Sequence, residues 1–148
     1  MVRKGSAVWN GSLKEGKGTV STESGTVSNA QYSFSTRFEN GKGTNPEELI
    51  AAAHAGCFSM ALSAQLGNAG ITPQSLETTA AVTLEKLDSG FTITKIHLDL
   101  VARIPGVDKA VFDKAAADAK AGCPVSKVLK AAEITLTTKL LSESATSA

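Results

Sequence analysis

The residues of this 148-residue chain best suited to covalent chemistry are its two cysteines, Cys57 and Cys123. Cys123 follows Gly122 and precedes Pro124, an order typical of one helix ending and another beginning with cysteine at its N-cap. Backbone N–H groups and the helix dipole favour a thiolate there, so local sequence predicts that Cys123 is the more acidic thiol. Cys57 lies in an apolar segment, where desolvation raises a thiol pKa unless a cation lies nearby.

Arg37 is the candidate for that cation. The chain has three arginines, Arg3, Arg37 and Arg103, and only Arg37 lies between aromatic residues, Phe34 and Phe38. It lies at the end of a predicted strand, just before a predicted helix. An arginine on an edge strand that forms a surface ion pair accounts for the same residues without any chemistry.

Other reactive residue types have simpler explanations. Glu47 and Glu48 suit the positive end of a helix dipole, a role that needs no chemistry. His54 and Cys57 share one helix face, as metal ligands do, but the chain has no CxxC pair, and His97 lies in a strand pattern. The metal signal is therefore weak. Both cysteines also fit the interpretation of small buried hydrophobic residues.

The elements that position these residues follow from the hydrophobic pattern. Short alternating runs at 7–9, 19–22 and 32–35 predict strands. Thr44–Asn45–Pro46–Glu47–Glu48 begins a helix that runs to Leu66 and is apolar on nearly every face. Such a helix needs cover on all sides, which favours a central, buried position and a homodimer.

The rest of the chain predicts a hairpin of strands at 76–86 and 91–104, a helix at 107–121, a short helix at 123–130 and a last strand at 134–140. The tail, 142–148, is predicted to be frayed. Strand blocks separated by helices indicate the α+β class, with antiparallel hairpin sheets packed on central helices in one domain, 1–148.

Composition excludes several classes of function. The chain is 42% hydrophobic and 20% charged, with a formal net charge of +1, so bulk charge would not draw it to nucleic acid or to an anionic membrane. Its start contains no apolar signal segment, and its apolar stretches look too short and interrupted to span a bilayer. We therefore expect a cytoplasmic protein with no nucleic-acid or membrane partner.

Two segments together resemble the OsmC/Ohr family of thiol-dependent peroxidases, in its OsmC branch. They are TNPEELIAAAHAGCFSMAL at 44–62 and GCPVSKVL at 122–129, and the resemblance extends from 35–39 to the last strand. It implies an intertwined homodimer of hairpin sheets wrapped on central helices, with two sites near the subunit interface. It also implies that Cys57 is the peroxidatic cysteine, Cys123 the resolving cysteine, and Arg37 and Glu47 their active-site partners.

The resemblance also implies a reaction linked to oxidative and osmotic stress. Cys57 would reduce an organic hydroperoxide to an alcohol and become a sulfenic acid, which Cys123 would convert to a disulfide. An external dithiol, such as a lipoyl group or a similar dithiol, would reduce that disulfide, without prosthetic group or metal. Apolar side chains at Phe38, Phe58 and Met60 would favour organic peroxides over hydrogen peroxide.

Three points stay open in the sequence. Glu47 lies ten residues before Cys57, about 15 Å along an unbroken helix. Three arrangements could bring Glu47 to Cys57: a helix break near Ala55–Gly56, an Arg37 side chain that spans the gap, or a second subunit that unites the groups, which is the alternative we favour.

The competing functions are a binding protein for a small hydrophobic ligand with structural cysteines, and a metal site on His54, Cys57 and Cys123. Whether Glu48 shares the task of Glu47 is also open.

Overall fold

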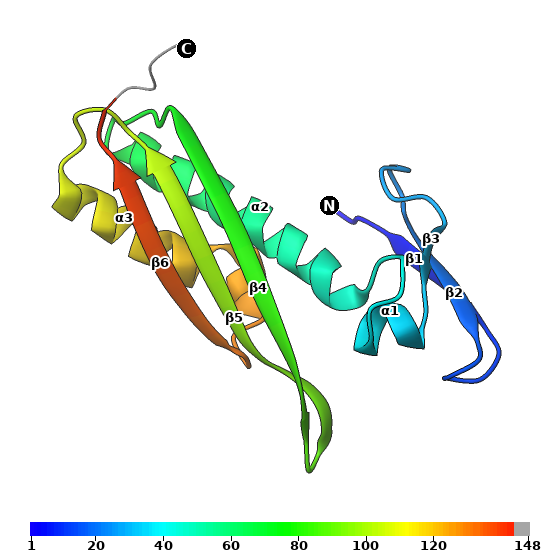
Figure 1. Cartoon of the computed structure of the whole chain (residues 1–148). Helices are drawn as coiled ribbons and strands as arrows, with labels where there is room; N and C mark the ends of the chain where they lie inside the picture. Colours follow the sequence, from blue (N-terminus) through cyan, green and yellow to red (C-terminus); the bar gives the residue numbers. More distant parts are fainter. Residues whose placement is uncertain (144–148) are drawn as a thin grey trace. The chain divides into compact units, whose positions relative to one another are not determined.

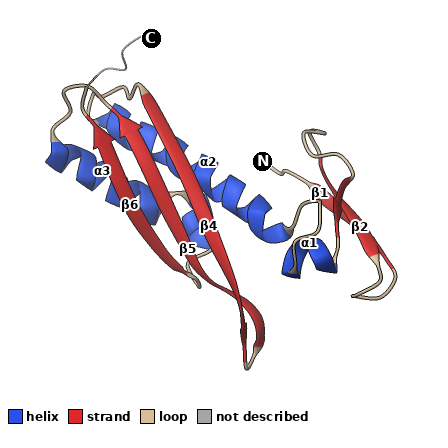
Figure 2. Cartoon of the chain, in the orientation of Figure 1, coloured by secondary structure: helices blue, strands red, loops and turns tan. Residues whose placement is uncertain are grey.

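The computed structural model describes residues 1–143 and divides into two compact units, Met1–Leu49 and Ile50–Ala148. The long helix α2 (Pro46–Asn68) begins in the first unit and continues in the second. Figure 1 shows the order of the elements along the chain, and Figure 2 distinguishes the helices from the strands.

Unit 1 contains a three-stranded antiparallel sheet in the order β1-β2-β3. Its strands are β1 (Gly5–Asn10), β2 (Lys17–Thr22) and β3 (Ala30–Tyr32). The rings of Trp9 and Tyr32 pack with their centroids 5.4 Å apart. Gly18 lies between them, where a Cβ atom would come within 2.6 Å of both rings, so only glycine fits this position.

The third predicted strand ends earlier than its alternating pattern indicates. Tyr32 is its last residue, and α1 (Phe34–Phe38) follows instead of an extended segment to residue 35. Ser33 begins this helix with a capping box: its Oγ accepts from Thr36 N at 3.3 Å, while Thr36 Oγ1 accepts from Ser33 N at 2.8 Å. The prediction that Arg37 ends a strand is therefore wrong, because the cap starts a helix that contains it.

Helix α2 begins as predicted. Asn45 Oδ1 accepts from the backbone N–H of Glu48 at 2.8 Å, and Pro46 occupies the first helical position. The helix is 23 residues long with a mean hydropathy of 1.4 in its most apolar window, so by length and composition it could cross a membrane. The expectation that every apolar stretch is too short is thus wrong, although a core helix of a soluble protein meets the same criterion.

Unit 2 contains the sheet β4-β5-β6, formed by β4 (Ser75–Leu87), β5 (Gly90–Arg103) and β6 (Glu133–Leu141). The predicted hairpin is present, since β4 and β5 pair antiparallel, with a register shift between Thr83 and Leu84. β6 joins the other edge of β5 in parallel, which differs from a sheet of hairpins alone. A parallel neighbour requires a crossover, and α3 (Lys109–Gly122) and α4 (Pro124–Val128) supply it.

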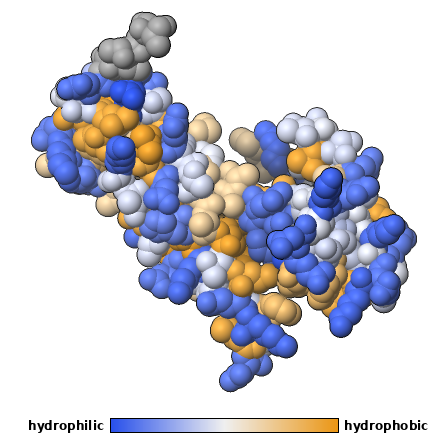
Figure 3. All heavy atoms as spheres, in the orientation of Figure 1, coloured by the Kyte–Doolittle hydropathy of each residue, from blue (hydrophilic) through white to orange (hydrophobic). Residues whose placement is uncertain are grey.

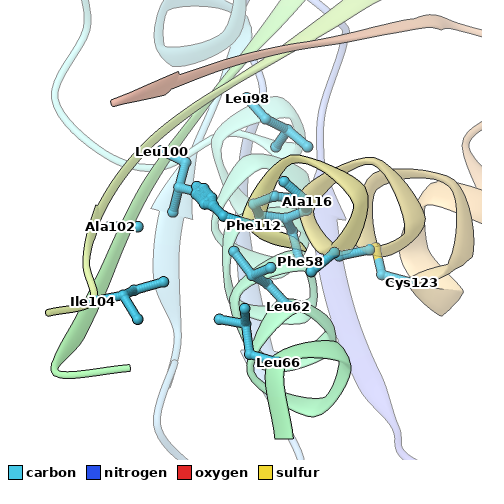
Figure 4. Packing of buried hydrophobic residues seen from close by; sticks show 12 residues of the cluster. Phe58, Leu62, Leu66, Leu98, Leu100, Ala102, Ile104, Phe112, Ala116 and Cys123 are labelled. Carbon is cyan, nitrogen blue, oxygen red and sulfur yellow. The ribbon is translucent and has the colours of Figure 1, made fainter. Parts of the chain in front are cut away.

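The core of unit 2 lies between one face of this sheet and the helices α2 and α3 (Figure 1). Alternate residues of β5 point into it, as the strand period requires. Figure 4 shows side chains from all three elements meeting there: Phe58, Leu62, Leu66, Leu98, Leu100, Ala102, Ile104, Phe112, Ala116 and Cys123. α2 is not buried all round, however, since Met60 is 78% exposed.

The α+β fold class is thus as predicted. Of the tail predicted to be frayed, residues 144–148 lie outside the described residues, but Ser142 and Glu143 do not fray. The carbonyl of Ser142 accepts from Gly106 N at 3.1 Å, and that of Glu143 accepts from Arg103 Nη1 at 3.0 Å.

Candidate active site

Cys57 and Cys123 lie together in unit 2, although a helix, a hairpin and a second helix separate them in sequence. Both are free thiols; Cys57 is half-buried on α2, and Cys123 is buried at the junction of α3 and α4. Burial raises the pKa of the Cys57 thiol. A hydrogen bond from the backbone N–H of Val125 lowers that pKa, whereas the hydrogen bond and the charge of Cys123 raise it further. Cys123 is therefore near enough to Cys57, at the beginning of α4, to influence the pKa of its thiol.

The helix junction at Cys123 matches its sequence signature. Cys123 is the C-cap of α3 and the N-cap of α4, with Pro124 at the first position of the new helix. Its Sγ accepts from the backbone N–H of Ser126 at 3.3 Å. Cys123 is 1% exposed, so this N–H replaces the water that would otherwise solvate the sulfur.

A buried polar chain leads away from Cys123. The thiol of Cys123 donates to Ser126 Oγ at 3.1 Å, and the same oxygen lies 2.7 Å from Nε2 of His54. His54 is completely buried on α2, and burial lowers its pKa. Its Nδ1 has no hydrogen-bond partner among residues 1–143.

Sequence reasoning missed Ser126 and Val125 and weighed His54 only as a metal ligand. One signal was available for Ser126, since the third residue after an N-cap places its backbone N–H on the cap. No local pattern predicts that the same hydroxyl meets a histidine more than seventy positions earlier. Within the described part of the chain, no three His, Cys, Asp or Glu residues form a group that could hold a metal ion.

Arg37 and Glu47 form an ion pair in unit 1. Arg37 Nε donates to Glu47 Oε1 at 2.8 Å, with the arginine side chain 39% exposed and the glutamate side chain 11% exposed. The guanidinium lies 5.3 Å from the ring centroid of Phe38, which itself packs on Phe34. Asn45 Nδ2 donates to the carbonyl of Thr36 at 3.1 Å and so ties α1 to the start of α2.

This pair uses only part of each side chain. Oε2 of Glu47 is buried and has no partner in the described residues, and the terminal nitrogens of Arg37 make no hydrogen bond there either. A guanidinium held at Nε keeps its terminal N–H groups available to an anion or a polar oxygen. The pair can therefore fix an arginine and still present donors.

Glu48 has a different environment. Its Oε2 accepts from Thr44 Oγ1 at 2.8 Å, and its side chain is exposed. It belongs to the cap of α2 and does not pair with Arg37. α2 is also continuous through Ala55 and Gly56, so the alternative of a helix break there is wrong.

The three apolar candidates for the substrate pocket lie in different surroundings. Phe58 is completely buried in the core of unit 2, next to Cys57 in sequence, whereas Met60 is exposed. Phe38 packs on Phe34 in unit 1, with ring centroids 4.9 Å apart.

Comparison with known proteins gives consistent matches. The family described as OsmC-like protein matches residues 39–139. Peroxiredoxin OsmC of Escherichia coli strain K12 is 61% identical over 140 residues, which cover 95% of this chain and 97% of that protein. An organic hydroperoxide resistance protein of Xanthomonas axonopodis pv. citri is 32% identical over 99 residues, covering 66% of this chain and 68% of that protein.

Solved structures of the same family have the same fold as this chain. The organic hydroperoxide resistance protein OhrB of Bacillus subtilis has a TM-score of 0.68 at 25% identity, covering 92% of this chain and 98% of that one. An OsmC-like protein of unknown function from Vibrio cholerae reaches 0.71 at 17% identity, covering 92% and 99%, and so shares the fold. The resemblance found in the two sequence segments is confirmed, and the chain belongs to the OsmC family.

Proposed function

We propose that this protein is a cysteine-based peroxidase that reduces organic hydroperoxides to alcohols. The observation that carries the proposal is the proximity of two free thiols from distant segments: Cys123 at the start of α4 is near enough to Cys57 on α2 to influence the pKa of its thiol. With two neighbouring thiols, one cysteine can be oxidised to a sulfenic acid and the other can then convert it to a disulfide. The names of relatives from Escherichia coli and Xanthomonas, a peroxiredoxin and a hydroperoxide resistance protein, support it.

The first step is a nucleophilic displacement at oxygen. The Cys57 thiolate attacks one oxygen of the hydroperoxide, the O–O bond breaks, and the other oxygen leaves as an alcohol after taking a proton. Cys57 becomes a sulfenic acid, oxidised by two electrons, while the peroxide is reduced by two. The N–H of Val125 stabilises the thiolate, but burial opposes it, so a further positive charge is needed.

Arg37 is the residue we propose for that charge. Glu47 holds its Nε, and its terminal nitrogens remain free in the described chain to stabilise the negative charge that develops on the peroxide. The pair would reach the thiols across a homodimer, as we favour from the sequence. Phe38, Phe58 and Met60 remain our candidates for the preference for organic peroxides over hydrogen peroxide.

The second step forms a disulfide. Cys123 attacks the sulfenic sulfur of Cys57, the S–O bond breaks, and water leaves. An external dithiol, of the lipoyl type or a similar one, then reduces the disulfide by thiol–disulfide exchange. These steps need no prosthetic group, and they suit a cytoplasmic protein because a reducing compartment keeps both thiols free.

The homodimer is supported by apolar surface on unit 2. The exposed side of α2 there carries Ala53, Gly56, Met60 and Ala64 at helical spacing. The tip of the β4–β5 hairpin extends past the helices of its unit (Figure 1), and apolar residues lie among hydrophilic ones at that tip (Figure 3). A second copy of the chain that packed against these surfaces would remove their apolar side chains from water. Light scattering at micromolar concentration should give twice the chain mass, and a monomer mass would contradict the dimer.

Peroxide turnover in the presence of a dithiol tests the function. We expect reduced protein to consume cumene hydroperoxide faster than hydrogen peroxide and to lose both titratable thiols after one equivalent of peroxide. A protein that only binds a small hydrophobic ligand would keep both thiols and turn over neither peroxide. That result would overturn the proposal.

A further inference from the structure

Three polar side chains in unit 2 form a continuous buried chain that ends on the proposed resolving sulfur. Cys123 Sγ donates to Ser126 Oγ at 3.1 Å, and Ser126 Oγ lies 2.7 Å from His54 Nε2. Exposure is 1% for Cys123, 3% for Ser126 and 0% for His54. A buried cysteine of this kind has little contact with water, so a proton leaving its thiol needs an acceptor inside the protein.

The geometry points to His54 as that acceptor. We propose that His54, acting through Ser126, takes the thiol proton of Cys123 as it attacks the sulfenic acid, and returns it to the oxygen that leaves Cys57. This inference rests on the proposed function and deepens it by dividing the two steps between different residues. Ser126 contacts the reacting sulfur. His54 is a positioning residue, one hydrogen bond farther from that sulfur, and it holds the proton during the step.

Two proton transfers and one exchange of bonds make up this step. The proton of Cys123 passes to Ser126 Oγ while the hydroxyl proton of Ser126 passes to His54 Nε2, leaving a thiolate and a transient imidazolium, which burial disfavours and which therefore gives its proton up again within the same step. The thiolate attacks Cys57 Sγ, the new S–S bond forms, and the S–O bond of the sulfenic acid breaks. The departing hydroxide takes the proton back from the relay and becomes water, so Cys123 is oxidised, Cys57 is reduced, and His54 is neutral again.

Two features of His54 favour this role over simple core packing. It precedes Cys57 by three residues on α2, so both side chains lie on one side of the helix and the proton need not travel far. Because Cys123 Sγ donates to Ser126 Oγ, the Ser126 hydroxyl is left to donate to His54 Nε2, and burial keeps that nitrogen unprotonated beforehand because it lowers the pKa of His54. The backbone N–H of Ser126 also donates to Cys123 Sγ at 3.3 Å, which stabilises the thiolate once it has formed.

Two variants separate a relay from a structural hydrogen bond. Ser126→Ala removes the bridge, and His54→Gln retains a hydrogen-bond partner for Ser126 but has no basic nitrogen. The matched control is Ser59→Ala, since Ser59 on α2 is also partly buried and hydrogen-bonded, at 2.7 Å to Thr78. Each reduced protein is mixed with one equivalent of cumene hydroperoxide and quenched with acid at intervals. Mass spectrometry then follows the sulfenic acid and the disulfide separately.

We expect disulfide formation to slow by at least about tenfold in both Ser126→Ala and His54→Gln, with a much smaller change in sulfenic acid formation. The longer-lived sulfenic acid should also give more sulfinic acid when peroxide is in excess. Ser59→Ala should match the wild type in both steps. If Ser126→Ala does not fold, His54→Gln alone decides.

Other outcomes overturn the inference. Disulfide formation at the wild-type rate in His54→Gln would show that a hydrogen bond is sufficient and that no proton is held there. Equal slowing of both steps would indicate a general distortion of the site. If the wild type forms neither sulfenic acid nor disulfide, the proposed function fails together with the relay, and this result is distinguishable because it occurs before any variant is compared.

Discussion

The ion pair of unit 1 and the thiol pair of unit 2 are built in different ways. Arg37 and Glu47 are ten residues apart in sequence, and local caps set their positions: Ser33 begins α1 and Asn45 begins α2. The pair is partly open to solvent, with the arginine side chain 39% exposed. Cys57 and Cys123, by contrast, meet only because α3, α4 and β6 cross over onto the edge of β5. The ion pair is thus positioned by local structure, and the two thiols by tertiary packing.

This difference determines how each region should respond to substitution. Removing a sulfur removes a bond-forming atom, so the chemical step that needs this atom should be lost. Changing the ion pair alters the electrostatic stabilisation of a reaction that remains possible, so the effects should be graded.

The largest effect should come from Cys57→Ser. Because the hydroxyl cannot replace the thiolate as a nucleophile toward peroxide, we expect turnover to fall by at least about 10³-fold. Peroxide consumption with a dithiol reductant measures it, and wild-type folding is checked by circular dichroism. A folded variant that retains a tenth of the wild-type rate would exclude Cys57 as the peroxidatic residue.

Cys123→Ser should separate the two thiols. The first equivalent of peroxide still oxidises Cys57, but no disulfide forms, so steady-state turnover with a lipoyl-type dithiol should drop by at least about tenfold. Sulfenic acid trapped by a dimedone reagent should accumulate in this variant and not in the wild type. Unchanged turnover would mean that Cys123 resolves nothing.

Substitutions in the ion pair should lower the rate of Cys57 oxidation less than loss of a sulfur does, and Arg37→Ala should lower it more than Glu47→Gln. Arg37→Ala removes the donors and should lower the rate of Cys57 oxidation about 10²-fold, whereas Glu47→Gln leaves the arginine in place and should cost about tenfold. Glu48→Gln is the matched control, because Glu48 bonds to Thr44 and not to Arg37. If all three variants oxidise at the same rate, the ion pair of unit 1 is not part of the thiol chemistry.

The pH dependence of oxidation sharpens the comparison. Burial raises the pKa of the Cys57 thiol, so the thiolate is the minor form at neutral pH and its fraction increases as the pH rises. The rate of Cys57 oxidation should therefore increase with pH, by up to about tenfold per unit below the pKa. In Arg37→Ala the same curve should move to higher pH. A flat profile between about pH 6 and pH 9 would contradict thiolate attack.

The smallest effect concerns the cap that positions the ion pair. Asn45→Ala removes the hydrogen bonds to Glu48 N and to the carbonyl of Thr36, and should lower the free energy of unfolding by about 1 kcal/mol. Urea denaturation measures this loss. Asn68→Ala, at the exposed last residue of α2, is the control and should change stability less.

Local chemistry explains what the sequence predicted well. The starts of α2 and α4 were predictable because Asn45–Pro46 and Cys123–Pro124 combine a capping residue with a proline. The strand predicted at 32–35 ends at Tyr32, because alternation over so few residues is weaker than the capping box of Ser33 and Thr36.

Long-range features could not be predicted from the residues alone. A strand pattern does not encode the direction of its neighbour, so nothing in 134–140 indicated parallel pairing with β5. The hydrogen bond between His54 and Ser126 likewise depends on where the crossover places α4. The pairing of Cys57 with Cys123 came from the family resemblance, since spacing alone cannot give it.

The crossover has one more consequence, for the denatured chain. A covalent bond between Cys57 and Cys123 would close a loop of about 65 residues. By reducing the conformational entropy of the unfolded chain, it would raise the free energy of unfolding by about 4 kcal/mol. Before the chain folds, the sulfurs find each other only at the low effective concentration of a long flexible tether. The disulfide would thus stabilise the native topology that allows it to form. The protein should therefore be harder to denature in its oxidised form, before a dithiol has reduced it.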